Sequence, residues 1–366
     1  MILMLSNMYP SAKYPNYGVF VKNLYEAMAQ ELPMEQVVLN KHVNKWHKLR
    51  AYIAYFAKSF VHIMSRKTQI VFVSYASYNA FPTLLARALG RRPLIITNLH
   101  GSDVTTESSL AQHLNFLTAA ILKHSDTVIV PSPSFKTMSE HKYGYSGAIV
   151  SPSGGVDTTY FKPQPAQKQP GVINLGYISR VDENKGWNVV LGAVRDLMQD
   201  NAAPKVHLTL VGSGTADAEC AQMIKDYGLS DVVTRIAMLP QAELLGQYNK
   251  LDVLAFPGAG TATGESLGLV GLEAMACGVP VIGADYGGIA TYVEEGQNGY
   301  LFDRKPGDDS SSASLAAKIR KFAGLDADAR AAMAQNARAT ALRYDAKKVN
   351  AELVAKLKAK YGELLQ

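Results

Sequence analysis

The chain has 366 residues and a mass of 39.6 kDa, more than a single hydrophobic core usually spans, so two domains are expected. Hydrophobic residues make up 48% and charged residues 19%, and the 29 Gly and 16 Pro follow no repeat, which excludes disordered, collagen-like and coiled-coil proteins. The net charge of +6 is modest, so the position of the charges matters more than their sum.

Short apolar runs alternate with helical patterns through the first half, which is typical of a parallel sheet with crossover helices. An amphipathic helix is predicted at residues 19–32, after a loop that holds Pro10, Pro15 and Gly18. Strands are expected at residues 2–5, 37–39, 70–74, 94–98, 127–130 and 148–151. Together these elements predict one doubly wound α/β layer.

A proline-rich stretch at residues 161–171 is predicted to link two domains. Further strands are expected at residues 172–177, 206–211, 233–238, 253–256 and 279–284, separated by helices. The last helix, residues 346–365, is predicted to pack back across the linker. We therefore expect a first domain of residues 1–165, joined by the C-terminal helix 346–366, and a second Rossmann-like domain of residues 166–345.

The basic excess lies in the first of these domains. Residues 1–165 contain 16 Lys and Arg against 8 Asp and Glu, a balance of +8, whereas the rest has 21 against 23, a balance of −2. No acidic residue occurs between Glu35 and Asp103, although ten basic residues do. This distribution predicts an anionic partner for the first half.

Residues 44–64 carry an apolar stripe if they are helical. Its members recur every three or four positions and are Trp46, Leu49, Ile53, Phe56, Phe60 and Ile63, with Tyr52 and Tyr55 beside them. The stripe is either core packing or a face that rests on an anionic bilayer. Nucleic acid is not expected as a partner, because no recognised binding motif accompanies the charge.

The sequence also indicates the cellular compartment. Cys220 and Cys277 are too few for a disulfide framework or a cysteine zinc site, which favours a reducing compartment. The first residues lack the basic region of a signal peptide, and no apolar stretch is long enough to span a bilayer. We therefore expect a cytoplasmic or peripheral protein.

The densest functional motif is a glycine-rich loop that leads into a short helix, expected to begin near Leu269 and to end at Gly278. The backbone amides of residues 268–270 and the helix dipole suit a diphosphate. Glu265 and Glu273 flank this position, where carboxylates accept hydrogen bonds from sugar or ribose hydroxyls. The alternative is that both are ordinary acids favoured by the helix dipole.

A second cluster follows the first strand of the second half, where Arg180 and Lys185 lie five positions apart in a loop before a helix. Two such cations can contact one diphosphate, or they can simply be solvated. Both clusters lie at carboxyl ends of strands, where open α/β sheets bind ligands. The Gly212-Ser-Gly214 turn suggests a dinucleotide oxidoreductase, but Asp217 stands where that fingerprint needs its third glycine.

Several motifs of the second half occur in a characteristic order. They are Gly176-x-x-x-Arg180 with Lys185-Gly186, Leu210-Val-Gly-Ser-Gly214, Glu265-x7-Glu273, Gly287-Gly288 and Asn298-Gly299. The first half adds Pro15-Asn-Tyr-Gly18, His100-Gly-Ser-Asp103 and Pro152-Ser-Gly-Gly-Val-Asp157. The set resembles family 4 of the retaining GT-B glycosyltransferases, most of all bacterial enzymes that build teichuronic acid, capsule, exopolysaccharide or O-antigen. This resemblance implies two Rossmann-like domains facing across a cleft.

The resemblance also implies roles for residues of the second half. Glu273 would hold the ribose hydroxyls of a nucleotide sugar, and Glu265 the hydroxyls of the donor sugar. Arg180 and Lys185 would bind the leaving diphosphate. The remaining donor-site residues implied in this half are Gly176, Gly212, Gly268, the amides of Leu269 and Val270, and, near the base, Leu239 in the loop of residues 238–241.

In the first half, the resemblance implies that His100 faces the donor sugar across the cleft, with Asp103 nearby. Gly18 would admit phosphate or acceptor. A histidine in this position can alternatively cap the strand end or fill space. Ser266 and Leu267 replace the usual glycine and aromatic after the first glutamate, and the loop of residues 258–264 looks enlarged, so the donor sugar stays open.

The implied enzyme is a hexosyltransferase that moves a sugar with retention from a UDP- or GDP-sugar to a lipid-linked or other saccharide acceptor. The implied place is the cytoplasmic, inner face of the plasma membrane, against its anionic surface. No metal or other cofactor is expected, because placed cations can stabilise the diphosphate, and Asp326-Ala-Asp328 is predicted to be a helix start. The second interpretation is a non-catalytic scaffold that binds nucleotide and membrane within a polysaccharide complex.

Overall fold

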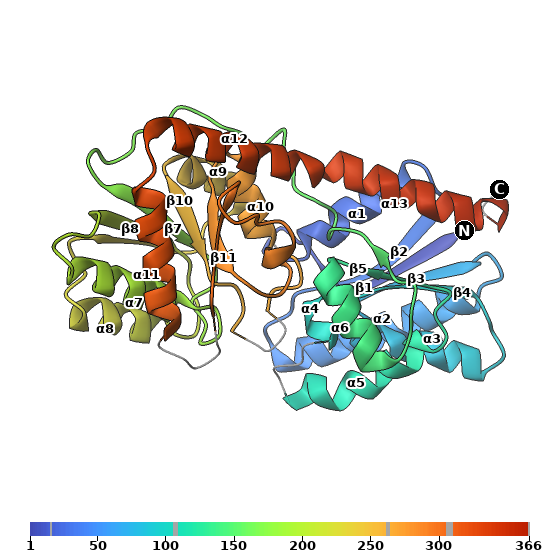
Figure 1. Ribbon diagram of the computed structural model, residues 1–366. Helices are drawn as coiled ribbons and strands as arrows, with labels where there is room; N and C mark the ends of the chain where they lie inside the picture. The colour runs from blue at the N-terminus through green and yellow to red at the C-terminus, as the bar shows by residue number, and fades with distance from the viewer. Residues whose placement is uncertain (15–16, 105–108, 261–263, 305–309, 365–366) are drawn as a thin grey trace. The chain divides into compact units, whose positions relative to one another are not determined.

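The computed structural model describes residues 1–14, 17–104, 109–260, 264–304 and 310–364. The chain divides into two compact units, each built around a six-stranded sheet (Figure 1). Unit 1 comprises Met1–Gly155 and Ala346–Gln366, and unit 2 comprises Val156–Asp345. Unit 1 is therefore built from two separate stretches of sequence.

The sheet of unit 1 has the strand order β2-β1-β3-β4-β5-β6, and all neighbours are parallel. Its strands are β1 (Ile2–Tyr9), β2 (Met34–Asn40), β3 (Ile70–Ser74), β4 (Leu94–Asn98), β5 (Thr127–Val130) and β6 (Ile149–Val150). The winding reverses between β1 and β3, so this is the switch point at which such sheets bind ligands.

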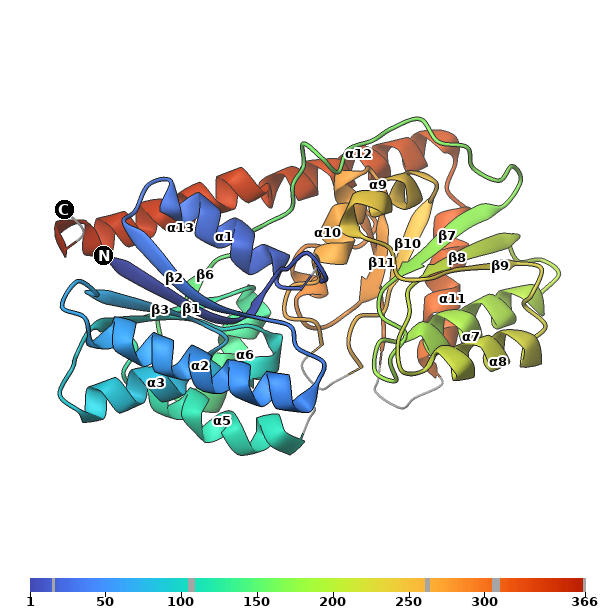
Figure 2. The ribbon, with the colours of Figure 1, turned by 180° about the vertical axis from the view of Figure 1, so that it is seen from behind.

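Helices cover both faces of this sheet. They are α1 (Val19–Ala29), α2 (Lys45–Met64), α3 (Ala76–Ala88), α4 (Gly101–Val104), α5 (Ser109–Leu122), α6 (Pro133–Tyr143) and α13 (Ala346–Tyr361). Alternate residues of β1 serve the two faces: Ile2 and Met4 pack with α1 and α13, and Leu3 and Leu5 with α2 and α3 (Figure 2). A strand that is covered on both faces consists largely of apolar residues, and this apolar run predicted β1 from the sequence.

Helix α13 completes the core of unit 1. Leu353 and Leu357 are buried against the same cluster as Val21 and Met28 of α1. The Tyr361 hydroxyl lies 2.6 Å from the Thr127 Oγ1 atom of β5. The last helix therefore belongs to the first unit, although it follows unit 2 in the sequence.

The sheet of unit 2 has the order β12-β11-β10-β7-β8-β9, again with parallel neighbours. Its strands are β7 (Ile173–Ile178), β8 (Val206–Val211), β9 (Val233–Ile236), β10 (Val253–Phe256), β11 (Val281–Ala284) and β12 (Gly299–Phe302). Its helices are α7 (Trp187–Met198), α8 (Asp217–Asp226), α9 (Gln241–Asn249), α10 (Leu269–Ala276), α11 (Ser310–Ala323) and α12 (Ala327–Arg343). The winding reverses between β7 and β10.

Residues 161–171 are not a free linker, contrary to the expectation from their prolines. Phe161 is buried in the core of unit 2, where its ring lies 5.8 Å from that of Tyr248. Further along, Lys168 pairs with Asp252 at 3.0 Å. One aromatic anchor and one ion pair thus fix the stretch along unit 2. The unit begins at Val156, earlier than the expected residue 166, because the Val156 amide already donates to the Tyr344 carbonyl at 2.9 Å.

The sequence did not predict strand β12. It has four residues and begins at Gly299, where a Cβ would lie 2.0 Å from the Val281 carbonyl oxygen of β11. A short strand that begins with a packing glycine offers too few positions for a periodic pattern. In contrast, the strands at residues 70–74, 94–98, 127–130, 206–211 and 253–256 have the expected bounds.

Helix α2 divides its apolar stripe between the two interpretations. Tyr55 and Ile63 are buried, and Phe56 packs partly buried beside them. Trp46 and Ile53, in contrast, are 73% and 60% exposed. The stripe is therefore core in its second half and exposed in its first half. Among the helices of the described residues, none combines the length and apolar character needed to cross a membrane.

Candidate functional site

The switch point of unit 2 brings the two predicted clusters together. The loop that holds Arg180 and Lys185 follows β7, and the loop that holds Glu265 follows β10, the neighbouring strand. The Lys185 Nζ atom lies 2.8 Å from the Glu265 Oε1 atom, and both side chains are largely shielded from solvent. This ion pair joins the clusters at the carboxyl edge of the sheet.

The start of α10 supplies free amides beside this pair. Gly268 precedes the helix with a φ of +87°, and a Cβ there would lie 2.7 Å from the Phe256 ring. The Tyr292 hydroxyl donates to the Gly268 carbonyl at 2.9 Å and fixes the turn. The amides of Leu269 and Val270 have no acceptor within their own helix, as at every helix start. An anion is the natural partner for this position.

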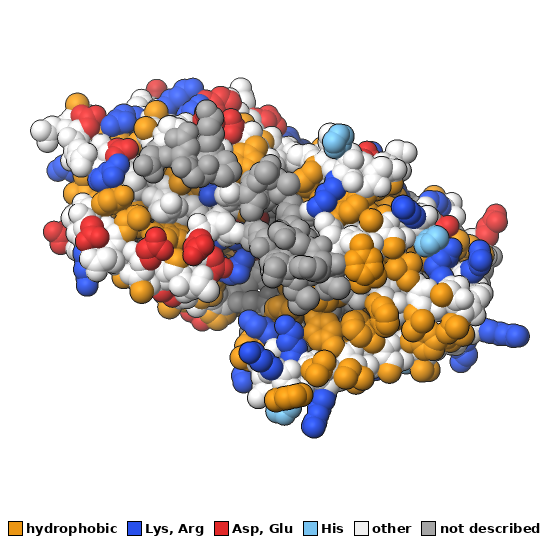
Figure 3. Space-filling model, turned by 90° about the horizontal axis from the view of Figure 1, so that it is seen from below, with side chains coloured by type: hydrophobic (Ala, Val, Ile, Leu, Met, Phe, Trp, Pro, Cys, Tyr) orange, Lys and Arg blue, Asp and Glu red, His pale blue; other side chains and the backbone are white. Residues whose placement is uncertain are grey.

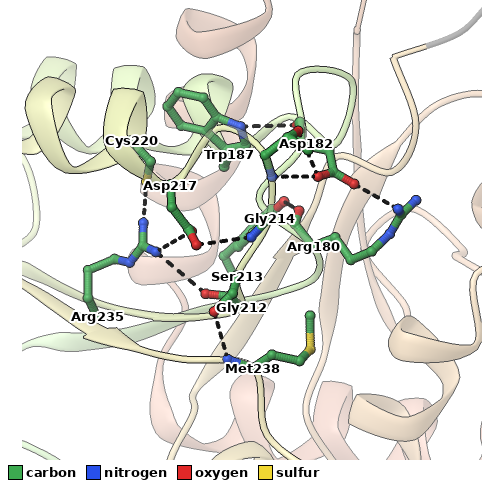
Figure 4. Close-up of polar contacts among 12 residues, drawn as sticks. Arg180, Asp182, Trp187, Gly212, Ser213, Gly214, Asp217, Cys220, Arg235 and Met238 are labelled. Carbon is green, nitrogen blue, oxygen red and sulfur yellow. Dashed lines mark hydrogen bonds and ion pairs between the residues drawn. The ribbon is translucent and has the colours of Figure 1, made fainter. Parts of the chain in front are cut away.

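The loop after β7 is held rigidly by its own neighbours (Figure 4). The Trp187 indole donates to the Asp182 carbonyl at 3.1 Å. The Tyr177 hydroxyl lies 3.1 Å from the carbonyls of Arg180 and Lys185. The guanidinium of Arg180 pairs with the Asp182 carboxylate at 2.8 Å and is otherwise exposed. Thus Arg180 and Lys185 each pair with a carboxylate, Arg180 with that of Asp182 and Lys185 with that of Glu265.

Asp182 links the two cations electrostatically. Burial would raise the pKa of its carboxyl, but hydrogen bonds from Thr215 and the charges of Arg180 and Lys185 lower that pKa overall. Asp182 thus stays ionised and orients the loop. The sequence analysis did not single it out, since an acid in a loop carries no periodic signal.

Gly212 and Gly176 are placed by packing. Gly212 directly follows β8 and has a φ of +155°, and a Cβ there would lie 1.8 Å from the Ser179 carbonyl oxygen. The turn that follows approaches the loop after β7 closely, as Figure 4 shows. Gly176 lies within β7, where a Cβ would lie 2.2 Å from the Leu251 side chain. Close backbone approach explains Gly212, and close side-chain approach explains Gly176.

Glu273 is buried within α10, and each of its two carboxylate oxygens accepts one hydrogen bond. Its Oε1 atom accepts from Gln241 Nε2 and its Oε2 atom from the Tyr248 hydroxyl, each at 2.8 Å. The pKa of this carboxyl is raised, because the effect of burial exceeds that of the two hydrogen bonds, which lower it. Gln241 and Tyr248 were not predicted as site residues. Leu239, predicted near the base, is partly buried just before α9 and packs against the hydrophobic cluster that contains Tyr248.

Arg304 is a further residue that the sequence analysis missed. Its guanidinium is buried and donates to the carbonyls of Pro257 and Gly258 and, at 3.4 Å, to that of Asn184. It thereby ties the loop after β10 to the loop after β7. The loop 258–264 was expected to be enlarged, and its residues 261–263 lie outside the described residues.

In unit 1, His100 lies at the end of β4, against the switch point. One ring nitrogen, Nε2, lies 2.9 Å from the Ser74 Oγ atom, and the ring lies 4.3 Å from that of Tyr75 and 5.1 Å from that of Phe20. Burial lowers the pKa of His100 to about 3. The imidazole is therefore neutral and fixed in orientation.

Asp103 is hydrogen bonded to the backbone of His100. Its side chain is fully buried, and its oxygens accept from the His100 amide at 2.9 Å and from the Ser77 amide and hydroxyl at 3.4 and 3.3 Å. Burial raises its pKa to about 6 against these hydrogen bonds. Asp103 has no exposed surface, and it lies beside His100 as expected, where its hydrogen bonds hold His100 and the start of α3 together.

Gly18 begins α1 with a φ of +75°. A Cβ at this position would lie 2.6 Å from the Met8 carbonyl oxygen of β1. The glycine thus lets α1 start directly against the end of β1, at the switch point of unit 1. This close approach is a sufficient structural reason for a glycine here.

The Asp326-Ala-Asp328 motif begins a helix, as predicted. The Asp326 carboxylate accepts from the Ala329 amide at 2.8 Å and caps α12, and Asp328 lies in the first turn. Within the described ranges, no three His, Cys, Asp or Glu side chains gather as a metal site would require.

Comparison with known proteins gives matches along most of the chain. Residues 159–340 match the family described as Glycosyl transferases group 1. WcaL of Escherichia coli, named for colanic acid biosynthesis, is 26% identical over 79% of this chain and 70% of its own length. N-acetyl-alpha-D-glucosaminyl L-malate synthase of Bacillus anthracis is 31% identical over 69% of this chain and 65% of its own. The match to a Pseudarthrobacter chlorophenolicus D-inositol 3-phosphate glycosyltransferase spans only 42% of that protein.

Solved structures give the fold over the full length. Anabaena HepE in complex with UDP aligns with a TM-score of 0.73 and 20% identity, over 98% of this chain and 99% of that one. Sucrose-phosphate synthase of Thermosynechococcus elongatus aligns with a TM-score of 0.77 and 18% identity, over 99% and 100%. The two parallel-sheet units and the solved structures show that the chain has the GT-B fold. The family match, together with the ordered motifs, shows that it belongs to the group 1 glycosyltransferases.

Proposed function

We propose that unit 2 binds a nucleoside diphosphate sugar at the switch point between β7 and β10. The observation that carries this proposal is the Lys185–Glu265 pair beside the free amides at the start of α10. A diphosphate needs cations and amide donors, and a sugar needs carboxylates, and this edge of the sheet offers all of them within two loops. HepE, a structural neighbour, is solved in complex with UDP and with UDP-glucose.

Each residue has a distinct part in this proposal. The amides of Leu269 and Val270, together with Lys185 and Arg180, hold the diphosphate. Glu273 accepts the ribose hydroxyls, since a carboxylate with two hydrogen bonds keeps further lone pairs. Glu265 accepts hydroxyls of the sugar once Lys185 turns to the phosphate. Leu239 lies near the base, which is uracil or guanine. Gly176, Gly212 and Gly268 allow the close packing that shapes this site.

The reaction we propose is transfer with retention at the anomeric carbon. The acceptor hydroxyl oxygen forms a bond to that carbon on the face from which the diphosphate leaves, the carbon–oxygen bond to the diphosphate breaks, and the acceptor proton passes to the departing phosphate oxygen. Lys185, Arg180 and the α10 amides stabilise the negative charge that develops there, and in the proposal they do so without a metal. Neutral His100 forms a hydrogen bond to the donor sugar, and Asp103 holds it in place.

For the acceptor we propose a lipid-linked saccharide at the cytoplasmic face of the plasma membrane. WcaL, the relative named for colanic acid biosynthesis, supports a cell-surface polysaccharide as the product. Trp46, Leu49 and Ile53 leave an apolar surface on α2, and Lys45 and Lys48 add positive charge beside it. Near an anionic bilayer each basic residue contributes about 1 kcal/mol of attraction. In the same proposal, Gly18 admits the phosphate or the acceptor at the unit 1 switch point.

One assay tests the enzyme against the scaffold. Purified protein is incubated with a panel of UDP- and GDP-sugars, and release of UDP or GDP is measured with and without membrane lipid extract. We expect release from one donor, and its loss in Lys185→Ala and Glu273→Ala. Equal release in both variants would overturn the site assignment. Nucleotide binding without release from any donor would favour the scaffold.

A further inference from the structure

Unit 1 contains an apolar cavity that the donor chemistry does not use. It lies between α2, α3 and α5 and has a volume of about 540 Å³. Small-molecule sites typically have volumes of about 300–1,000 Å³. Figure 3 shows hydrophobic side chains gathered on this face of unit 1, with Lys and Arg side chains at their margin. The cavity is thus large enough to hold a ligand of its own.

Aromatic rings from two helices build its wall. The rings of Tyr52 and Phe56 lie 5.7 Å apart, those of Tyr52 and Tyr78 6.0 Å, and those of Phe56 and Phe81 5.7 Å. Leu49, which also lines the cavity, is 52% exposed, and Phe81 is 48% exposed. Uncovered apolar side chains that surround a hollow indicate a binding surface, because covering them is favourable.

The charge around the cavity indicates an anionic occupant. Lys45 and Lys48, both exposed, line it. A second hollow, of about 640 Å³, lies at the same end of α2 and is lined by Lys13 and Lys41. No acidic residue occurs in the sequence from residue 36 to residue 102, so nothing in this stretch neutralises these lysines. An apolar body with a negatively charged end matches both features.

The cavity shares one residue with the group that holds His100. Ser77 lines the cavity, and its hydroxyl donates to the Asp103 Oδ1 atom at 3.3 Å. The Oδ2 atom of Asp103 accepts from the His100 amide at 2.9 Å. A molecule in the cavity therefore lies close to the residue proposed to contact the sugar.

We propose that this cavity binds the hydrocarbon chain of a single-chain anionic lipid, with the lipid's phosphate at Lys45 and Lys48. The inference rests on the proposed function, in which unit 1 receives the acceptor, and names the part of the acceptor that unit 1 holds. The chain leaves the bilayer for the apolar wall, and the phosphate brings the attached saccharide toward His100. Binding the chain in a cavity is distinct from resting a flat face on the membrane.

The test is direct binding of dodecyl phosphate, below its critical micelle concentration, to the full chain by isothermal titration calorimetry. We expect saturable one-to-one binding, at least tenfold tighter than that of neutral dodecyl maltoside. Leu49→Glu should weaken it at least tenfold and Ile53→Glu less than twofold. Both residues are exposed on α2, but only Leu49 lines the cavity, so folding is preserved in both and the pair is matched.

A second pair tests the phosphate. Lys48→Glu should weaken dodecyl phosphate binding at least fivefold, whereas Arg50→Glu, the same charge change two positions on and outside the cavity, should leave it within twofold. Absence of wild-type binding would overturn the inference, and so would equal losses in Leu49→Glu and Ile53→Glu, which indicate a flat surface. No donor or turnover enters the assay, so a failure of the proposed transferase activity remains distinguishable from a failure here.

Discussion

The Lys185 ammonium and the Glu265 carboxylate, from loops after adjacent strands, lie 2.8 Å apart and shield each other from solvent. In the proposed function, a diphosphate at the α10 start would compete with Glu265 for this ammonium. Glu265 would then be released to accept hydrogen bonds from the sugar, so that the pair would couple recognition of the phosphate to recognition of the sugar.

Lys185→Ala should lower kcat by about 100- to 1,000-fold, the usual effect of removing one preorganised charge from a departing anion. Steady-state release of UDP or GDP from the matching donor measures it. Lys168→Ala is the control, because Lys168 pairs at 3.0 Å with Asp252, which precedes β10 and so lies at the opposite end of that strand from the Glu265 loop. Similar rates in both variants would contradict the assigned role of Lys185.

Glu273→Gln should raise the donor Kd by about 10- to 100-fold, because a hydrogen bond to a charged group is worth about 1.5–3 kcal/mol. The measurement is titration with UDP and GDP. Glu243→Gln, an exposed acid of the neighbouring helix α9, should leave the Kd unchanged. A Glu273→Gln protein that binds nucleotide normally would remove the ribose contact from the proposal.

His100 should make unit 1 sensitive to acid. Burial lowers the pKa of His100 to about 3 from its unfolded value of about 6.5, so its neutral form stabilises the fold above pH 6.5 and this stability is lost as the pH falls. Between pH 6.5 and pH 5 the loss is about 2 kcal/mol. Asp103, with a raised pKa of about 6, opposes it, since its contribution is present at low pH and is lost as the pH rises.

The two effects separate in a difference measurement. The unfolding free energy of His100→Gln minus that of the wild type should rise by about 2 kcal/mol from pH 6.5 to pH 5, because Asp103 titrates in both proteins. Urea unfolding followed by circular dichroism measures it. A pH-independent difference for His100→Gln would show that the imidazole is not desolvated.

Gly268→Ala should destabilise unit 2 by about 3 kcal/mol, which combines a left-handed φ with steric overlap at the Phe256 ring. Gly296→Ala is matched, since Gly296 also has a positive φ, +77°, but no atom lies within 4 Å of its added Cβ. It should cost about 1 kcal/mol. Only Gly268→Ala should also weaken nucleotide binding. Equal costs in thermal unfolding would mean that the α10 start is not tightly packed.

The sequence predicted most of the strands because buried parallel strands consist largely of apolar residues, as at Ile2–Leu5 in β1 and at residues 70–73 in β3. It failed at β12, where Gly299 breaks the pattern, and at residues 161–171, where one buried Phe161 outweighs three prolines. Single anchoring contacts have no periodicity, and so a linker and a packed strap look alike in sequence.

The same limit applies to the site. Glu265, Glu273 and Lys185 were predicted as site residues because they belong to an ordered motif. Their supports, Tyr248, Gln241 and Arg304, come from distant parts of the chain and meet the motif only after folding. Asp103 belongs to the His100–Asp103 motif, but its side chain is fully buried. A sequence pattern does not distinguish a residue that contacts a ligand from one that positions its neighbour.

Because α13 belongs to unit 1, it affects the order in which the two units can complete their folding during synthesis. Unit 2 is one continuous segment and can fold as soon as residue 345 has left the ribosome, whereas unit 1 lacks Leu353, Leu357 and Tyr361 until α13 has been translated. Until then one face of the first sheet is without part of its cover and is open to chaperones or to mispairing. The half that is synthesised first is therefore the half that matures last.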